Sequence, residues 1–163
     1  MSLPPLTPLP DLLQGYAMRA EQDFIDALLA RVDFLSIGSN DLMQFMFAVD
    51  RDNTRVSARF DDINPALVRA LKLIVDKAGA AKVPVTLCGE MGGKPLEALA
   101  LLAIGFRGLS MSPSGIGPVK AMIRALDLKD ARAWLDDLLA SGVSATSMKA
   151  EALAYAEARG IPV

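Results

Sequence analysis

The chain has 163 residues, of which 52% are apolar and 22% charged, and it carries a net charge of -2 with a pI near 5.1. This composition excludes disorder along the whole chain, and without a basic stripe it disfavours nucleic acid as a partner. The apolar stretches fall short of a membrane span, no secretory signal is visible, and Cys88 is the only cysteine, so we expect a cytoplasmic protein without disulfides.

The first part of the chain predicts a leader, a helix and a strand. Residues 1–10 contain four prolines and are interpreted as a flexible leader, with the folded domain over 11–163. Apolar residues recur at helical spacing over 11–30. The apolar run 32–37 predicts a buried strand that leads into the polar loop 38–41. A helical pattern follows to residue 49 and is interrupted by the charged loop 50–53.

The remaining elements alternate between helices and strands. Asn64 before Pro65 is a typical helix start, and apolar residues mark one helical face as far as residue 78. A second strand over 83–88 leads into the glycine-bearing loop 89–93. A helix over 95–103 and a third strand over 109–112 follow. Residues 113–117 are then interpreted as a loop, with Pro118 opening the next helix, and two alanine-rich helices follow from residue 129.

Three successive strand–loop–helix units predict an α/β fold with parallel strands and right-handed crossovers. In each unit the polar loop lies at the carboxyl end of its strand. Active sites of α/β proteins and barrels lie at this end. The chain contains no histidine, which excludes histidine bases, histidine metal ligands and phosphohistidine within it.

Each candidate site residue also has a plain structural interpretation. A single cysteine such as Cys88 is most often a small buried residue. Asn40 and Asp41 could only cap the following helix, and Arg51 could be a solvated charge. Glu90 could support a site or simply be exposed. The glycine-rich loop after Ser112 could bind phosphate or form a tight turn.

Taken together, four segments resemble motifs of the enzyme I family of phosphoenolpyruvate-protein phosphotransferases. They are DFLSIGSNDLMQ at 33–44, AVDRDN at 48–53, LCGEMGG at 87–93 and LSMSP at 109–113. Ser39 and the residues 43–47 are similar to nitrogen-branch members. The resemblance implies the C-terminal portion of a phosphoenolpyruvate-binding (β/α)8 barrel, with parallel strands alternating with helices and extra C-terminal helices.

The resemblance also implies roles for four residues. Cys88 matches the catalytic residue that delivers a proton to the methylene carbon of enolpyruvate. Asn40 and Arg51 match substrate-binding residues, and the planar guanidinium of an arginine suits a phosphoryl group. Asp41 matches a ligand of an essential Mg2+ ion, which prefers carboxylate oxygens. The implied partners are phosphoenolpyruvate, the remainder of enzyme I with its phosphoryl-accepting histidine, and the phosphocarrier protein.

Two alternatives remain at this point. One is an enzyme similar to pyruvate phosphate dikinase or phosphoenolpyruvate synthase. The other is a catalytically inert fragment that only oligomerises. Because three βα units cannot close a barrel, we expect exposed strand edges, a homo-oligomer such as a dimer, and no turnover by the isolated chain.

Overall fold

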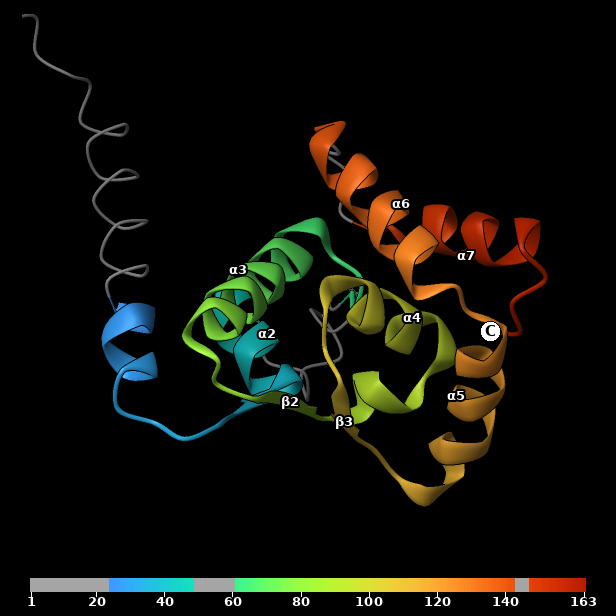
Figure 1. Ribbon diagram of the computed structural model, residues 1–163. Helices are drawn as coiled ribbons and strands as arrows, with labels where there is room; N and C mark the ends of the chain where they lie inside the picture. Colours follow the sequence, from blue (N-terminus) through green and yellow to red (C-terminus); the bar gives the residue numbers. More distant parts are fainter. Residues whose placement is uncertain (1–23, 49–60, 143–146) are drawn as a thin grey trace, which may run out of the picture.

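The computed structural model describes residues 24–48, 61–142 and 147–163 (Figure 1). In these residues three short strands form one parallel sheet in the order β1-β2-β3. They are β1 (Leu35–Gly38), β2 (Val85–Cys88) and β3 (Gly108–Ser110). The α/β class and the parallel strands expected from the sequence are therefore confirmed. The expected leader over 1–10 lies outside the described residues.

The two faces of the sheet differ in chemistry. Ile37, Leu87 and Leu109 share one row of the register and pack with the hydrophobic core. The next row contains Gly38, Cys88 and Ser110, which are all exposed. Because side chains alternate along a strand, one face is covered and the other carries small polar side chains. Parallel sheets are usually covered on both faces, so the second face is unusual among the described elements.

Helix α2 (Ser39–Phe47) follows β1 without a break, and helix α3 (Pro65–Ala81) forms the crossover to β2. The Oδ1 atom of Asn64 accepts a hydrogen bond from the Ala66 amide at 2.8 Å, and Pro65 occupies the first turn. This is the helix start that the sequence predicts. Leu67, Val68 and Leu71 of α3 are fully buried, which confirms the predicted apolar face.

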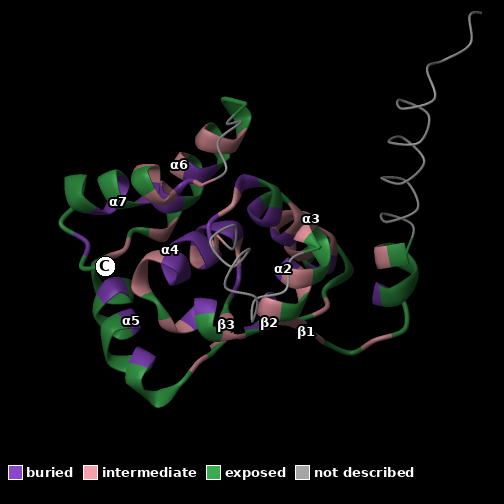
Figure 2. Ribbon diagram, turned by 180° about the vertical axis from the view of Figure 1, so that it is seen from behind, coloured by how far each residue is buried: buried purple, intermediate pink, exposed green. Residues whose placement is uncertain are grey.

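Helix α4 (Pro95–Ile104) is the centre of the fold: seven of its ten residues are buried and the other three are half-buried (Figure 2). It contacts α3 as well as three later helices, α5 (Pro113–Ala125), α6 (Leu128–Ala140) and α7 (Lys149–Ala158). In Figure 1, α4 lies between the sheet and the pair α6 and α7. Apolar side chains around the whole helix therefore have partners on every side, as a buried helix requires.

The start of α5 corrects one prediction. The sequence predicts a loop over 113–117 and a helix start at Pro118, but α5 begins at Pro113 and contains Pro118 in its interior. Two local features explain the difference. Pro113 suits the first helical position, where its missing N–H would lack a partner anyway. Gly117 precedes Pro118, and without a Cβ it avoids the clash that usually removes this position from the helical region.

The C-terminal helices are joined by an aromatic and charged cluster. The rings of Trp134 and Tyr155 stack with their centroids 4.5 Å apart, and the Tyr155 hydroxyl donates to Asp130 Oδ2 at 2.7 Å. The Arg159 guanidinium lies over the Tyr155 ring and pairs with the same carboxylate. The hydrogen bonds that Arg159 and Tyr155 donate to Asp130 hold the pKa of this carboxyl group below its usual range.

No helix of the described ranges is long and apolar enough to cross a membrane.

Replacing Tyr155 by Phe is expected to change how stability depends on pH. Burial and the hydrogen bond to Asp130 raise the pKa of the phenol well above its ordinary value. The stability that this group contributes is therefore complete below pH 10 and is lost as the pH rises through the folded-state value. At pH 7, Tyr155→Phe should cost about 1–2 kcal/mol of unfolding free energy.

Between pH 10 and 12 the stability of this variant should decline less steeply than that of the wild type. Urea unfolding at each pH measures both effects. Parallel curves for the two proteins over this range would show that Tyr155 is not the group that titrates.

Candidate functional site

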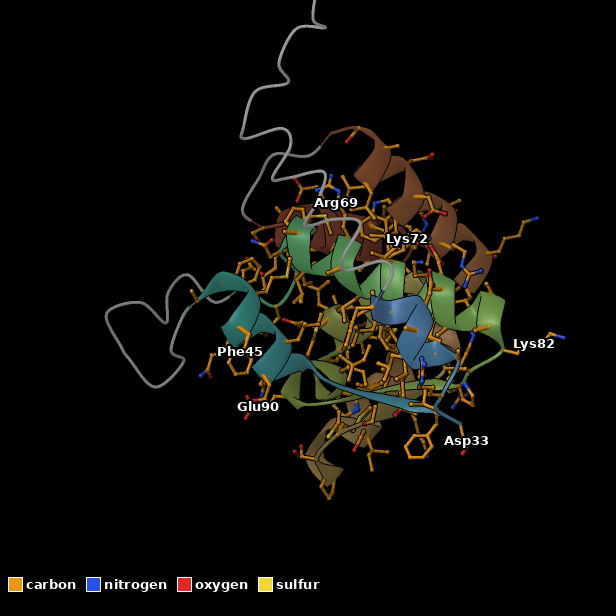
Figure 3. The ribbon with its side chains drawn as sticks, turned by 90° about the vertical axis from the view of Figure 1, so that its left-hand side faces the viewer. Asp33, Phe45, Arg69, Lys72, Lys82 and Glu90 are labelled. Atoms are coloured by element: carbon orange, nitrogen blue, oxygen red, sulfur yellow. The ribbon has the colours of Figure 1, made fainter. Side chains whose placement is uncertain are left out.

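A cavity of about 650 Å3 lies at the carboxyl ends of the strands. Its walls come from the start of α2, the end of β2 with the following 3-10 helix (Glu90–Gly93), the end of β3 and the start of α5. Figure 3 separates the two ends of the sheet, with Glu90 and Phe45 at this end and Asp33 and Lys82 at the other. The lining residues are Asn40, Cys88, Gly89, Glu90, Gly93, Lys94, Pro95, Ser110, Met111, Ser112, Ser114, Gly115 and Pro118.

Two of the four predicted site residues line this cavity together. Asn40 is half-buried in the first turn of α2, and Cys88 is the last residue of β2. The thiol is exposed, so the interpretation of Cys88 as a small buried residue is wrong. The register explains the placement, because Cys88 pairs with Gly38 immediately before α2 and with Ser110 on the other side.

Asp41 lies beside the cavity without lining it. Its carboxylate is exposed in the first turn of α2, and Gly38 rather than Asn40 or Asp41 is the N-cap. The interpretation of Asn40 and Asp41 as mere capping residues is therefore wrong as well. No group of three metal-ligating side chains occurs within the described ranges. Arg51 falls outside the described residues.

The start of α2, which carries Asn40, and the end of β2, which carries Cys88, touch each other through Ser39 and Gly89. Ser39 is fully buried, and its hydroxyl has no hydrogen-bond partner among the described residues. Gly89 has a φ of +145°, and a Cβ at this position would overlap the Ser39 Oγ atom. This contact fixes the start of α2 against the end of β2. The sequence signal for it is a glycine directly after the predicted strand.

The opposite wall of the cavity depends on glycine in a different way. A Cβ on Gly115 would lie 2.7 Å from the carbonyl oxygen of Gly93 and 2.8 Å from its Cα. The start of α5 can therefore pack directly on the 3-10 helix only when residue 115 is glycine. Ser112 and Ser114 lie beside this contact and share a hydrogen bond at 2.9 Å. The glycine-rich segment after Ser112 is thus a helix-packing site rather than a loop.

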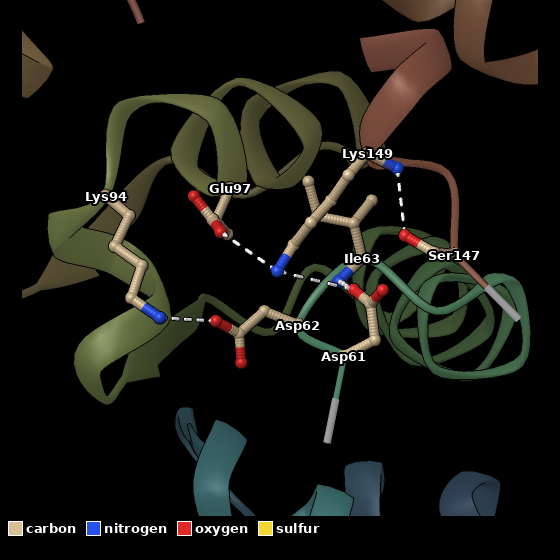
Figure 4. Close-up of polar contacts among 7 residues, drawn as sticks. All are labelled: Asp61, Asp62, Ile63, Lys94, Glu97, Ser147 and Lys149. Carbon is tan, nitrogen blue, oxygen red and sulfur yellow. Dashed lines mark hydrogen bonds and ion pairs between the residues drawn. The ribbon is translucent and has the colours of Figure 1, made fainter. Parts of the chain in front are cut away.

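Sequence reasoning missed a basic residue, Lys94, in the lining of the cavity. Lys94 is the only lysine or arginine among the described lining residues, and its ammonium group lies 2.5 Å from Asp62 Oδ2 (Figure 4). Glu90, the only acidic residue in the lining, is exposed. The sequence signal for Lys94 is its position directly after the glycine-bearing segment 89–93, at the carboxyl end of a predicted strand. Its partner Asp62, which comes from the loop before α3, could not be identified from sequence spacing.

Further polar contacts join the start of α7 to the segment that contains Asp61 and Asp62, directly before α3. The Lys149 ammonium lies 3.7 Å from Asp61 and 3.9 Å from Glu97 (Figure 4). The Met148 amide donates to the Ile63 carbonyl at 2.9 Å. The carboxylates of Asp62 and Glu97 are only 14% and 9% exposed. The loop before α3 is therefore held between α4 and α7.

A parallel sheet packed against helices, with a cavity at the carboxyl ends of its strands, defines an α/β protein whose cavity lies where α/β proteins bind their ligands. Residues 20–128 match the family described as PEP-utilising enzyme, PEP-binding domain. The chain belongs to this family.

Several curated proteins are similar to this chain. A protein named phosphoenolpyruvate-dependent phosphotransferase system from Salmonella typhimurium is 39% identical over 134 residues, which are 82% of this chain and 18% of the relative. A protein of the same name from Escherichia coli is 38% identical over 134 residues, which again are 82% of this chain and 18% of the relative. A phosphoenolpyruvate-protein phosphotransferase from Borreliella burgdorferi is 37% identical over 128 residues, 78% of this chain and 22% of that protein. The chain thus spans about a fifth of the length of these relatives.

Proposed function

We propose that this chain binds phosphoenolpyruvate as the C-terminal portion of the (β/α)8 barrel of an enzyme I, a phosphoenolpyruvate-protein phosphotransferase. The observation that supports the proposal best is the meeting of Asn40 and Cys88 in one cavity, although they belong to different βα units. The strands missing from a closed barrel would come from the rest of the enzyme. The names of the relatives favour this function over a dikinase or synthase.

In the proposed reaction the phosphoryl group passes from phosphoenolpyruvate to a histidine in another domain, and pyruvate forms when the remaining enolate takes up a proton. Cys88 is suited to donate that proton, because its thiol is exposed to the cavity at the end of β2. Asn40 would donate and accept hydrogen bonds with the substrate. Arg51 would hold the phosphoryl group. The product phosphohistidine would then serve the phosphocarrier protein.

Asp41 is the proposed protein ligand of a Mg2+ ion. Its carboxylate is exposed in the first turn of α2, so it offers the hard oxygen that this ion prefers. Magnesium sites often use one or two carboxylates together with substrate oxygens and water. The ion would therefore take its other ligands from the substrate and from the rest of the enzyme, and it would neutralise charge on the phosphoryl group.

The proposed assembly is a homo-oligomer. Phe34 and Phe45 are 67% and 83% exposed, and the sheet has one uncovered face among the described elements. The rest of the barrel would cover the strand edges and the open sheet face, whereas the exposed aromatic side chains favour association with a second copy.

Calorimetric titration with phosphoenolpyruvate and MgCl2 tests the proposed function. The isolated chain should bind the substrate, and Asn40→Ala should weaken binding by about tenfold or more, because one good hydrogen bond to a charged group contributes about 1.5–3 kcal/mol. Asp137→Ala, an exposed change on α6, is the control and should leave affinity unchanged. The isolated chain should release no pyruvate, since the phosphoryl acceptor is a histidine and this chain has none.

Two results would contradict the proposal. One is the absence of any binding heat by wild type at millimolar substrate with MgCl2. That result would favour the inert oligomerising fragment. The other is equal binding by wild type and Asn40→Ala, which would place the substrate elsewhere on the molecule.

A further inference from the structure

Lys94 combines a fixed backbone with a half-exposed side chain. Its amide donates to the Met91 carbonyl, and its own carbonyl accepts from the Ala98 amide at 2.8 Å, so the residue is anchored at the start of α4. The side chain remains 49% exposed. A lysine carries its charge on a flexible four-carbon stem. The ammonium group can therefore change partner without any change in the backbone.

The partner of Lys94 in this structure is a carboxylate that lies outside the cavity lining. Asp62 is 14% exposed, and its Oδ2 lies 2.5 Å from the ammonium nitrogen. Burial alone would lower the pKa of Lys94, but the hydrogen bond and charge of Asp62, with Glu97 and Glu90, raise it above its ordinary value. Lys94 is thus a protonated cation whose charge is balanced by Asp62.

The remaining lining residues make this cation important for a negatively charged ligand. They include the carboxylate of Glu90 and several neutral hydroxyl groups, but no other lysine or arginine among the described residues. An anion entering the cavity meets repulsion from Glu90, and Lys94 is the described lining side chain that can compensate for it. The Asp61 and Glu97 carboxylates are already paired with Lys149.

We propose that Lys94 is an anion-binding residue of the cavity, which contacts the substrate's negatively charged oxygens, and that Asp62 is the counter-ion it leaves when the anion binds. The substrate class, a small phosphorylated carboxylic acid, rests on the proposed function. The anion-binding role of Lys94 rests on the cavity and the ion pair. Asp62 therefore competes with the ligand for the ammonium group, and the two residues have opposite effects on anion affinity.

The single cysteine provides a direct probe of this charge, because Cys88 lines the same cavity. In alkylation the thiolate sulfur displaces iodide, and iodoacetate is anionic whereas iodoacetamide is neutral. The rate with iodoacetate divided by the rate with iodoacetamide reports the electrostatic potential at the thiol. This ratio is independent of the thiolate fraction, because both reagents react with the thiolate. At low ionic strength, Lys94→Gln should lower this ratio by about threefold, and Asp62→Asn should raise it by a similar factor.

Two control variants, a replacement variant and a change of salt concentration complete the test. Lys94→Arg keeps the charge and should keep the ratio near the wild-type value. Lys129→Gln, an exposed change on α6 outside the cavity, should leave the ratio unchanged. If Asp62→Asn unfolds, Asp62→Ala replaces it, and the Lys94 variants remain decisive in either case. High salt should reduce all the differences, since the interaction is screened.

An unchanged ratio in Lys94→Gln, or an equal drop in Lys129→Gln, would overturn the proposal, as would a lower ratio in both Asp62 variants. Protection of Cys88 by phosphoenolpyruvate with MgCl2 separates this inference from the proposed function. If Lys94→Gln lowers the ratio but phosphoenolpyruvate gives no protection, the anion site at Lys94 is supported and the assignment of its substrate fails.

Discussion

Gly89→Ala is expected to lower the free energy of unfolding by about 2–4 kcal/mol. Two costs contribute. Gly89 has a φ of +145°, which side-chain-bearing residues rarely adopt, and the new methyl group would overlap the Ser39 Oγ atom. Because the second cost depends on one identifiable atom, it can be removed by a second substitution. Urea denaturation of the single and double variants measures the two contributions.

Ser39→Ala supplies the matched variant. The Ser39 hydroxyl is buried without a partner among the described residues, so removing it should be neutral or raise the unfolding free energy by up to about 1 kcal/mol. In the double variant the closest atom of residue 39 to the new methyl group is its Cβ, at 3.4 Å, which is an ordinary contact distance. The Gly89→Ala change should therefore cost at least about 1 kcal/mol less on the Ser39→Ala background. Additive effects would show that Ser39 and Gly89 do not pack as described.

This contact also concerns the site, since Ser39 precedes Asn40 and Gly89 follows Cys88. Relief of the overlap in the Gly89→Ala protein would have to move one loop relative to the other. Phosphoenolpyruvate binding should therefore weaken in Gly89→Ala and recover, at least in part, in the double variant. Unchanged binding in a folded Gly89→Ala protein would show that the two loops act independently.

Gly115→Ala and Gly117→Ala should have opposite effects although both residues lie in α5. At Gly115 a methyl group would lie 2.7 Å from the Gly93 carbonyl oxygen, and this contact is with backbone that cannot rotate away. We expect a loss of about 2–3 kcal/mol. At Gly117 no atom lies within 4 Å of the added Cβ.

Gly117→Ala is therefore the control for Gly115→Ala. Alanine has the higher helix propensity, by about 1 kcal/mol, but a Cβ directly before Pro118 opposes the helical region and offsets part of the gain. The net change should be small, between about 0 and 1 kcal/mol of stabilisation. Thermal and urea unfolding of both variants measure the difference. A similar loss at both positions would mean that α5 does not pack on the 3-10 helix through Gly115.

The local features of the fold were accessible from the sequence because each has a short-range physical cause. Apolar runs of strand length predicted the three strands, and the Asn64-Pro65 pair predicted the start of α3. The polar loops at the carboxyl ends of the strands predicted that Asn40 and Cys88 lie at one edge of a parallel sheet. The start of α5 was not accessible in this way, because both Pro113 and Pro118 suit the first turn of a helix, and only the packing of Gly115 on Gly93 selects the earlier one.

What the tertiary structure decided depends on residues distant in sequence. No spacing rule joins Asp62 to Lys94, or Gly93 to Gly115, since these pairs form only when separate βα units pack side by side. The burial of α4 on every side likewise requires α6 and α7 to cover it. The sequence by itself determined the family, the strand order along the chain and the candidate residues Asn40, Asp41, Arg51 and Cys88. The packing of those units decided the shape of the cavity, placed Lys94 in its lining and paired it with Asp62.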